Sequence, residues 1–213
     1  MPLLEFPERL DEIVFLLINR ASCHSLLDSV MLLLINPFTW IPPCVFMVLF
    51  MFVKTGKHGW QFILYSLITV AITESSSSLI KNAVGRLRPC FDANIQGLFR
   101  NLVDCSGVYS FPSSLAANCF GLAAFWFWSL FKTTGKKWEW LWTWTVLICY
   151  AQIYVGQHFP SDAVAGALLG LTAGTTMAKI FGFAWDSGFD WQRISASVKR
   201  KINPGRESVY IAD

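Results

Sequence analysis

A histidine and an aspartate stand four residues apart in the stretch VGQHFPSDAVAG, residues 155–166. Pro160, between them, favours the first turn of a helix, because the N–H that proline lacks would have no partner there. His158 then lies just outside this helix and Asp162 just inside it, so a short turn brings the carboxylate to one ring nitrogen. The other ring nitrogen stays free as a nucleophile. The alternative is a purely structural histidine near a helix start.

Two upstream segments carry groups that bind phosphate. The first, KNAVGRLRP, contains the cation Lys81 and the planar fork of Arg88. The second, FPSSLAAN, places Ser113 and Ser114 at the expected start of a helix. A cation, an arginine fork and the free N–H groups of a helix start can bind a phosphoryl group and stabilise its developing charge. Together with His158, these segments predict a site for phosphoryl transfer.

The composition is that of a membrane protein. Of the 213 residues, 54% are hydrophobic and 15% charged, and the mean hydropathy is +0.46. This is more apolar surface than a water-soluble domain of this size can bury. Five stretches, uncharged except for Glu74 and Lys179, are each about long enough to cross ~30 Å of hydrocarbon as helix: residues 29–53, 59–80, 106–131, 140–157 and 163–185. The sequence therefore predicts an all-α, polytopic membrane helical bundle of five or six transmembrane helices.

Whether the N-terminal segment crosses the membrane decides between five and six transmembrane helices. One helical face carries apolar residues and the acidic residues lie away from it: Leu10, Ile13, Val14 and Leu17 against Glu8, Asp11 and Glu12. This spacing is typical of an amphipathic helix lying along a membrane surface. A surface helix packed on the spans fits the pattern equally well.

We expect one membrane domain over residues 1–213. It consists of the amphipathic segment 1–27, the helical bundle 28–185 with an active-site loop at 85–112, and a cytoplasmic tail at 186–213. Asparagine and prolines interrupt the first apolar stretch, so its first part is expected to be a separate, partly inserted helix; the interrupting residues are Asn36, Pro37, Pro42 and Pro43.

The net charge of +3 is too small to indicate nucleic acid as a partner. Three basic clusters follow the first, third and last spans: Lys54, Lys57 and His58; Lys132, Lys136 and Lys137; Arg193 and Lys199, Arg200 and Lys201. The positive-inside rule places all three in the cytoplasm. The 85–112 loop and His158 then face the other side, where Lys81, Arg86, Arg88 and Arg100 oppose the charge bias and indicate anion binding.

Glu74 stands within the second apolar stretch, where a carboxylate is costly and should face the bundle interior or a wet cavity. Residues 74, 78 and 81 share one helical face. Glu74 is therefore either a buried counter-charge for Lys81 or a structural hydrogen-bonding residue.

Cys90 and Cys105 both lie in the predicted outer loop, while three of the other cysteines fall in apolar stretches and Cys23 lies near the N-terminal helix. A disulfide between this one pair is expected outside the cytoplasm, with two reduced thiols as the alternative.

From about Lys54 to Trp185, the chain resembles the type 2 phosphatidic acid phosphatase superfamily of membrane lipid-phosphate phosphatases. The family's first signature, a lysine separated by six residues from Arg-Pro, is complete at Lys81, Arg88 and Pro89. Its third is kept as Gly156, His158, Pro160 and Asp162. The resemblance implies that His158 forms a phosphohistidine, that Asp162 orients it, and that Lys81 and Arg88 bind the phosphate.

Two positions depart from the family pattern. Its second signature, Pro-Ser-Gly-His, reads Pro-Ser-Ser-Leu here, so Leu115 stands where the general-acid histidine is expected. Ahead of the third signature, Gln152 stands where a phosphate-binding arginine is expected, and Arg86 is a candidate to substitute for it in part.

The resemblance implies a metal-independent and cofactor-independent lipid phosphatase, weakened by Leu115, in a bacterial inner membrane with its site facing the periplasm. Candidate substrates are polyprenyl diphosphate, phosphatidylglycerol phosphate, phosphatidic acid and lipid A phosphate. The alternatives are a catalytically silent lipid-phosphate binder, favoured by Leu115 and Gln152, and a phosphotransferase that passes the group from His158 to another lipid. The sequence predicts no oligomeric state.

Overall fold

The computed structural model describes residues 2–21, 24–56 and 59–187. The chain divides into two compact units, 1–181 and 182–213, and the residues of the site all lie in the first. The described residues contain seven α-helices: α1 (Pro2–Ala21), α2 (Ser25–Ile35), α3 (Ile41–Thr55), α4 (Gly59–Val84), α5 (Ser114–Thr134), α6 (Trp140–Tyr154) and α7 (Pro160–Asp186), with the short 3-10 turns η1 (Pro37–Trp40) and η3 (Pro89–Phe91). The predicted all-α class is confirmed.

Several of these helices are long and apolar enough to cross a membrane. Within the described residues there are four: Pro37–Thr55, Gly59–Val84, Ser114–Thr134 and Pro160–Asp186. A fifth exists only if the pair Arg9–Arg20 and Ser25–Ile35, bent by 117°, counts as one broken span. The chain is therefore an integral membrane protein, with four or five candidate spans among the residues that the structure describes.

The stretch 140–157, predicted as a span, folds as the 15-residue helix α6. At 1.5 Å per residue this helix is about 22 Å long, short of the ~30 Å hydrocarbon core. The chain leaves helical geometry after Tyr154 because a turn at Gly156, with φ of +92°, leads to His158. A side chain at Gly156 would also press on Phe99 and on the carbonyl of Arg100.

The first apolar stretch breaks where its asparagine and prolines predict. Helix α2 ends at Ile35, and the side chain of Asn36 accepts a hydrogen bond from the N–H of Phe38 at 3.0 Å. Pro37 then opens η1, which leads directly into α3. The first part of this stretch is thus a separate helix.

Helices α5 and α7 approach so closely that glycine is required at their contact. A Cβ atom at Gly166, Gly170 or Gly174, spaced one turn apart on α7, would collide with backbone carbonyls of α5. Small residues at this spacing allow two helix backbones to pack together inside a membrane. At the start of both helices the N–H of Ser113 donates to the carbonyl of Asp162 at 3.0 Å. The tight packing therefore brings the second and third sequence segments together.

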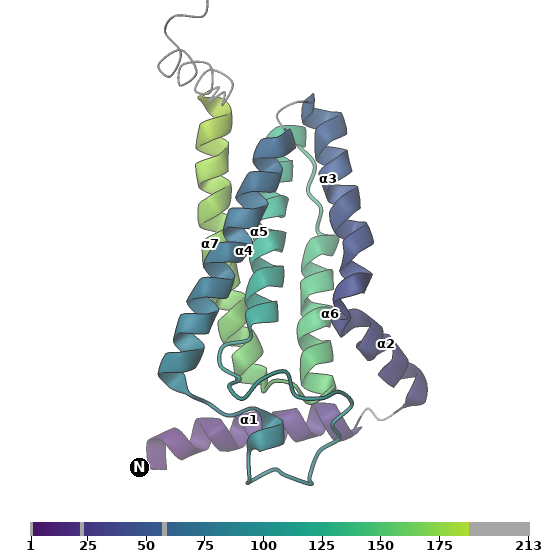
Figure 1. Cartoon of the computed structure of the whole chain (residues 1–213), viewed down its shortest axis with the longest axis vertical. Helices are drawn as coiled ribbons and strands as arrows, with labels where there is room; N and C mark the ends of the chain where they lie inside the picture. The colour runs from purple at the N-terminus through teal and green to yellow at the C-terminus, as the bar shows by residue number, and fades with distance from the viewer. Residues whose placement is uncertain (1, 22–23, 57–58, 188–213) are drawn as a thin grey trace, which may run out of the picture. The chain divides into compact units, whose positions relative to one another are not determined.

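Helix α1 runs across the end of the bundle that carries the 85–112 loop (Figure 1). Its apolar side chains Leu10, Ile13 and Leu17 are 53%, 62% and 64% exposed, as expected for a helix lying on a membrane surface. The opposite face is buried against the protein. Asp11, which the spacing places away from the apolar face, lies on this buried face, where Arg86 and the start of α7 supply partners for its carboxylate.

The tail from residue 188 onward, Cys23, and the basic residues Lys57 and His58 lie outside the described part of the chain. So do Arg193 and the run Lys199 to Lys201. The predicted tail and the single-domain organisation stay predictions.

Candidate active site

The three sequence segments meet around one cavity of about 470 Å³. Its lining comes from the last turn of α4, the first turn of α5, the end of α6 and the turn before α7. The predicted site residues that line it are Lys81, Arg88, Ser114, Leu115, Gln152 and His158, together with Glu74. Predicted site residues as much as 84 positions apart in the chain, Glu74 and His158, thus share one chamber.

His158 and Asp162 form the buried pair that their spacing predicts. The side chains are 5% and 0% exposed, and His158 Nδ1 lies 3.5 Å from Asp162 Oδ2. This distance is at the outer limit of a hydrogen bond, and Nδ1 has no well-aligned partner among the described residues. Asp162 Oδ2 also accepts the N–H of Phe159 at 2.8 Å, which fixes the carboxylate toward the ring.

The other ring nitrogen of His158 faces a cation. Arg88 Nη1 lies 3.1 Å from His158 Nε2. A guanidinium can only donate, so Nε2 is the acceptor and the proton of a neutral ring belongs on Nδ1, toward Asp162. Burial lowers the pKa of His158, while Asp162 acts in the opposite direction. The ring is therefore held neutral, with its basic nitrogen toward Arg88.

Arg88 is itself buried, with 5% of the residue exposed. Its Nη1 donates to the backbone and side-chain oxygens of Gln157, both at 3.1 Å. Its Nε has no hydrogen-bond partner within the described residues. A buried guanidinium with a donor to spare suits an anion in the cavity.

The two serines at the start of α5 differ in their surroundings. Lys81 Nζ donates to Ser114 Oγ at 2.8 Å, and both residues line the cavity. Ser113 is completely buried, where its hydroxyl donates to Gln152 Oε1 at 2.7 Å and caps α5 by accepting the N–H of Ala116. Its backbone N–H is bonded to the carbonyl of Asp162. Ser113 is thus occupied as a structural cap, whereas Ser114 and Lys81 face the chamber.

Leu115 lines the cavity with an aliphatic side chain and brings no proton donor to it. Gln152 lies at the same chamber but is tied to Ser113, so it offers an amide where an arginine would offer a charge. Both departures seen in the sequence therefore fall at the site itself.

Arg86, considered as a substitute for the missing arginine, is turned away from the cavity. Its two terminal nitrogens reach two carboxylates, Asp11 at 2.6 Å and Asp162 at 2.9 Å. Its guanidinium carbon lies 4.2 Å from the centre of the Phe159 ring. Arg86 has its charge balanced inside the protein, which is not the situation of a phosphate ligand.

Glu74 has the hydrogen-bonding role that was one of its two alternatives. Its Oε2 accepts from Asn118 Nδ2 at 2.8 Å, and Asn118 Oδ1 accepts from Thr73 Oγ1 at 2.5 Å. The residue is exposed and not buried. Lys81, its other possible partner, donates a hydrogen bond to Ser114, and the charge of Glu74 acts on it across the cavity that both residues line.

The 85–112 loop is cross-linked within itself by a disulfide and is tied to the site by Gln157. Cys90 and Cys105 are joined in a disulfide. Gln157 donates to the carbonyl of Asp104 at 3.0 Å and accepts from the hydroxyl of Ser106 at 3.1 Å. Because Gln157 also accepts from Arg88, it connects the loop to the cation beside His158.

Arg100, expected to contribute to anion binding, has a structural partner. Its Nη2 lies 2.6 Å from Asp28 Oδ2 on α2, and the other oxygen of Asp28 accepts from the hydroxyl of Tyr154 at 2.5 Å. This network ties α2 to the loop and to the end of α6, away from His158.

Sequence reasoning missed Asp11 and Gln157. Gln157 directly precedes His158, but a glutamine there carries no pattern of its own. Asp11 is one of the acidic residues that the helical spacing places away from the apolar face of α1, and no role was inferred for it. Nothing in the local sequence connects it to residues 86 and 162.

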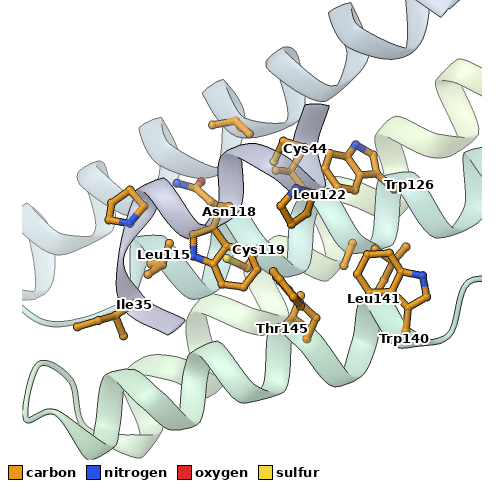
Figure 2. A pocket seen from close by; sticks show the side chains of 16 residues that line it. Ile35, Cys44, Leu115, Asn118, Cys119, Leu122, Trp126, Trp140, Leu141 and Thr145 are labelled. Atoms are coloured by element: carbon orange, nitrogen blue, oxygen red, sulfur yellow. The ribbon is translucent and has the colours of Figure 1, made fainter. Parts of the chain in front are cut away.

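A second, apolar cavity of about 290 Å³ adjoins the site. Figure 2 shows side chains of α5 and α6 around it, among them Leu122, Trp126 and Trp140. Ile35, Pro37 and Leu115 line both cavities. Leu115 therefore stands at the boundary between a polar chamber and an apolar one.

A membrane helical bundle that gathers lysine, arginine and a buried histidine–aspartate pair at one end defines a class of phosphoryl-transfer proteins. The model of the PAP2 superfamily matches residues 59–186, and the chain belongs to this superfamily of membrane lipid phosphatases. It is 28% identical to a lipid A 4'-phosphatase of Porphyromonas gingivalis over 85% of this chain and 77% of that protein. It is 30% identical to the lipid A 4'-phosphatase of Bacteroides thetaiotaomicron over 79% and 75%.

The fold has a solved counterpart. The crystal structure of a PAP2-type phosphatidylglycerolphosphate phosphatase from Bacillus subtilis superposes with a TM-score of 0.66 at 20% identity, over 81% of this chain and 85% of that one. The match to the family model confirms the family resemblance inferred from three short segments.

Proposed function

We propose that this protein removes phosphate from a lipid phosphate or diphosphate through a phosphohistidine on His158, without a metal. The observation that carries the proposal is the orientation of the buried His158 ring. Its Nε2 faces the cavity cation Arg88, while its Nδ1 faces Asp162. This is the arrangement that a nitrogen nucleophile beside a bound phosphoryl group requires.

The reaction has two steps. In the first, His158 Nε2 attacks phosphorus, the N–P bond forms, and the P–O bond to the lipid breaks. Asp162 stabilises the positive charge that develops on the ring, and Lys81 and Arg88 stabilise the phosphoryl oxygens. In the second, water attacks phosphorus and gives up a proton to solvent, the N–P bond breaks, inorganic phosphate leaves with the oxygen of that water, and neutral His158 is restored.

The apolar cavity supports a lipid as the substrate. We propose that this cavity holds the first part of the hydrocarbon chain, because it adjoins the phosphate chamber at Leu115, which lines both cavities. Its lining of leucine, proline and tryptophan matches a chain rather than a sugar or nucleotide.

The lipid is best sought by assay. Two relatives are lipid A 4'-phosphatases, which makes a lipid A phosphate the first candidate, followed by polyprenyl diphosphate, phosphatidylglycerol phosphate and phosphatidic acid. The experiment is phosphate release from each lipid in detergent, with His158→Ala protein as background. Release above that background from at least one lipid supports the proposal, and equal release by both proteins from every lipid contradicts it.

The second candidate function is a lipid-phosphate binder without turnover. Leu115 and Gln152 favour it, since one removes a proton donor and the other a cation, and Arg86 is committed to Asp11 and Asp162. This candidate predicts binding of lipid phosphates with no release of phosphate. The phosphotransferase alternative has no particular contact that favours it.

Phosphate affinity should depend on Lys81 and Arg88 more than on Arg86. Losing a charge-assisted hydrogen bond costs about 1.5–3 kcal/mol, a loss of roughly 10- to 150-fold in affinity. We expect this loss for vanadate, a phosphate analogue, in Lys81→Ala and in Arg88→Ala, as measured by calorimetric titration. The matched control is Arg86→Ala, and a larger loss there than in Arg88→Ala would overturn the assignment.

We further propose that five helices, α3 to α7, cross the membrane in alternating directions. The starts of α5 and α7 meet at one end, so α6 must carry the chain back despite its length. Lys54, Lys132 and Lys136 lie at the ends away from the site, which the positive-inside rule assigns to the cytoplasm. The site then faces the periplasm of a bacterial inner membrane. Single-cysteine labelling that finds positions 94 and 136 on the same side would refute this orientation.

A further inference from the structure

The N-terminal helix α1 reaches the site through one buried carboxylate. Asp11 Oδ2 lies 2.6 Å from Arg86 Nη2, and Arg86 Nη1 lies 2.9 Å from Asp162 Oδ1. One guanidinium therefore bridges two carboxylates, one on α1 and one beside His158. The Asp11 and Asp162 side chains are 7% and 0% exposed, so salt and water screen this bridge weakly.

Asp11 also closes the start of α7. Its Oδ1 accepts the N–H of Ser161 at 2.8 Å, and its Oδ2 accepts the hydroxyl of Ser161 at 2.5 Å. The first N–H groups of a helix have no partner within the helix. Asp11 supplies one from another part of the chain, and so fixes the turn that carries Asp162.

Phe15, one turn further along α1, keeps Asp11 in place. Its ring packs against Phe159 with centroids 5.4 Å apart, and Phe15 is completely buried. Phe159 in turn lies under the guanidinium of Arg86. Docking of α1 and formation of the carboxylate–arginine–carboxylate bridge are therefore one event.

We propose that Asp11 is a positioning residue for the phosphoryl-transfer site, acting through Arg86 to leave Asp162 enough negative charge to hold and stabilise His158. With Asp11 in place, Arg86 divides its charge between two carboxylates. Without it, Arg86 pairs with Asp162 alone, and the charge that stabilises a positive His158 ring is diminished. This inference rests on the proposed function, because it gives Asp11 a role only through the roles of Asp162 and His158.

The titration of His158 reports this coupling directly. The chain has three histidines, so spectra of protein labelled with ¹³C or ¹⁵N in histidine are simple, and loss of a signal in His158→Gln assigns it. The charged groups that face His158 are Arg88 from the loop, Lys81 from α4 and Asp162 from α7. Glu74 and Asp104 line the same cavity, and all of these stay unchanged in the variants below.

Asp11→Asn should lower the pKa of His158, since a negative charge is removed and Arg86 turns fully to Asp162. Arg86→Gln should raise it, since a positive charge is removed. In the double variant, the effect of Asp11→Asn should largely vanish, because partners in one network are not additive. Where phosphate release is measurable, Asp11→Asn should reduce kcat by roughly 10- to 100-fold, the scale of a ~1 Å misplacement, with little change in KM.

Asp28→Asn is the matched control. Asp28 pairs with Arg100 at the same distance of 2.6 Å and likewise ties an N-terminal helix to the loop, but this ion pair is not shared with Asp162. We expect Asp28→Asn to lower Tm and leave the titration of His158 unchanged.

Two outcomes would overturn the proposal. One is an Asp11→Asn protein that loses Tm as Asp28→Asn does but keeps the wild-type His158 titration, which would make Asp11 an anchor of α1 and no more. The other is a shift of the His158 pKa by Asp11→Asn that is equally large in the wild-type background and in the Arg86→Gln background. The titration needs no turnover, so it decides the role of Asp11 even if no lipid releases phosphate and the proposed function fails.

Discussion

Leu115→His should raise the rate of phosphate release from a lipid phosphomonoester by about 10²- to 10⁴-fold, the usual contribution of a general acid. Attack by His158 on a monoester expels an alkoxide, which is a strong base and needs a proton as the P–O bond breaks. Leu115 lines the cavity that holds His158 but cannot supply one. A histidine at this position can.

The same substitution should raise the rate on a lipid diphosphate by a much smaller factor. There the leaving group is a phosphate, whose charge is spread over its oxygens and which departs without a proton. The measurement is phosphate release from one monoester and one diphosphate lipid, by wild type and by Leu115→His. We therefore expect wild type to be nearly inactive on the monoester and less impaired on the diphosphate.

Two control variants separate proton donation from size and polarity. Leu115→Asn adds a polar side chain that does not titrate, and Leu122→His places an imidazole two turns deeper, in the apolar cavity. Neither should accelerate the monoester reaction. If Leu115→His leaves both rates unchanged, or if Leu115→Asn matches it, the role assigned to this position is wrong.

His158→Ala should abolish phosphate release while lipid phosphate binding persists. Loss of a nucleophile costs on the order of 10⁶-fold in rate, whereas Lys81 and Arg88 still line the cavity and bind the anion. The comparison is best made in the Leu115→His background, where the rate is highest. Asp162→Asn should retain somewhat more activity than His158→Ala, because it removes the orienting group and keeps the nucleophile.

The pH dependence of the same reaction follows from the burial of His158. Burial lowers the pKa of its imidazole, so the neutral, nucleophilic form persists to lower pH than for an exposed histidine. The rate should therefore hold as pH falls through the ordinary value of 6.5 and decline only below it, as measured in initial rates across this range. A decline centred above that value would contradict a buried, neutral nucleophile.

The parts of the site that short spacings define could be predicted from the sequence. Arg88 lies seven residues after Lys81, and Asp162 lies four after His158, so each pair is placed by one helix end and the turn beside it. Because both pairs belong to signatures of one family, the sequence also predicts that the two pairs lie close together in the folded protein. The Cys90–Cys105 pairing was likewise predicted from a shared loop and compartment, and the structure joins these two residues.

Other features depended on contacts between distant elements. From the sequence, Asp11 is only one of several acidic residues away from the apolar face of α1. In the structure α1 packs across the start of α7, where Arg86 and Ser161 donate hydrogen bonds to the Asp11 carboxylate. Arg86 was expected near the phosphate because the sequence shows its charge but does not show that Asp11 and Asp162 pair with it. The end of α6 was placed too late, because hydropathy continues through Tyr154 and Val155 while the turn at Gly156 ends the helix.

The most direct test of the account is to trap the phosphorylated protein. Brief incubation with a ³²P-labelled lipid diphosphate, followed by an alkaline quench that preserves phosphohistidine and by peptide mass spectrometry, should find the label on His158 in wild type and nowhere in His158→Ala. Phosphate released while His158 stays unlabelled, or label on a different residue, would contradict the account.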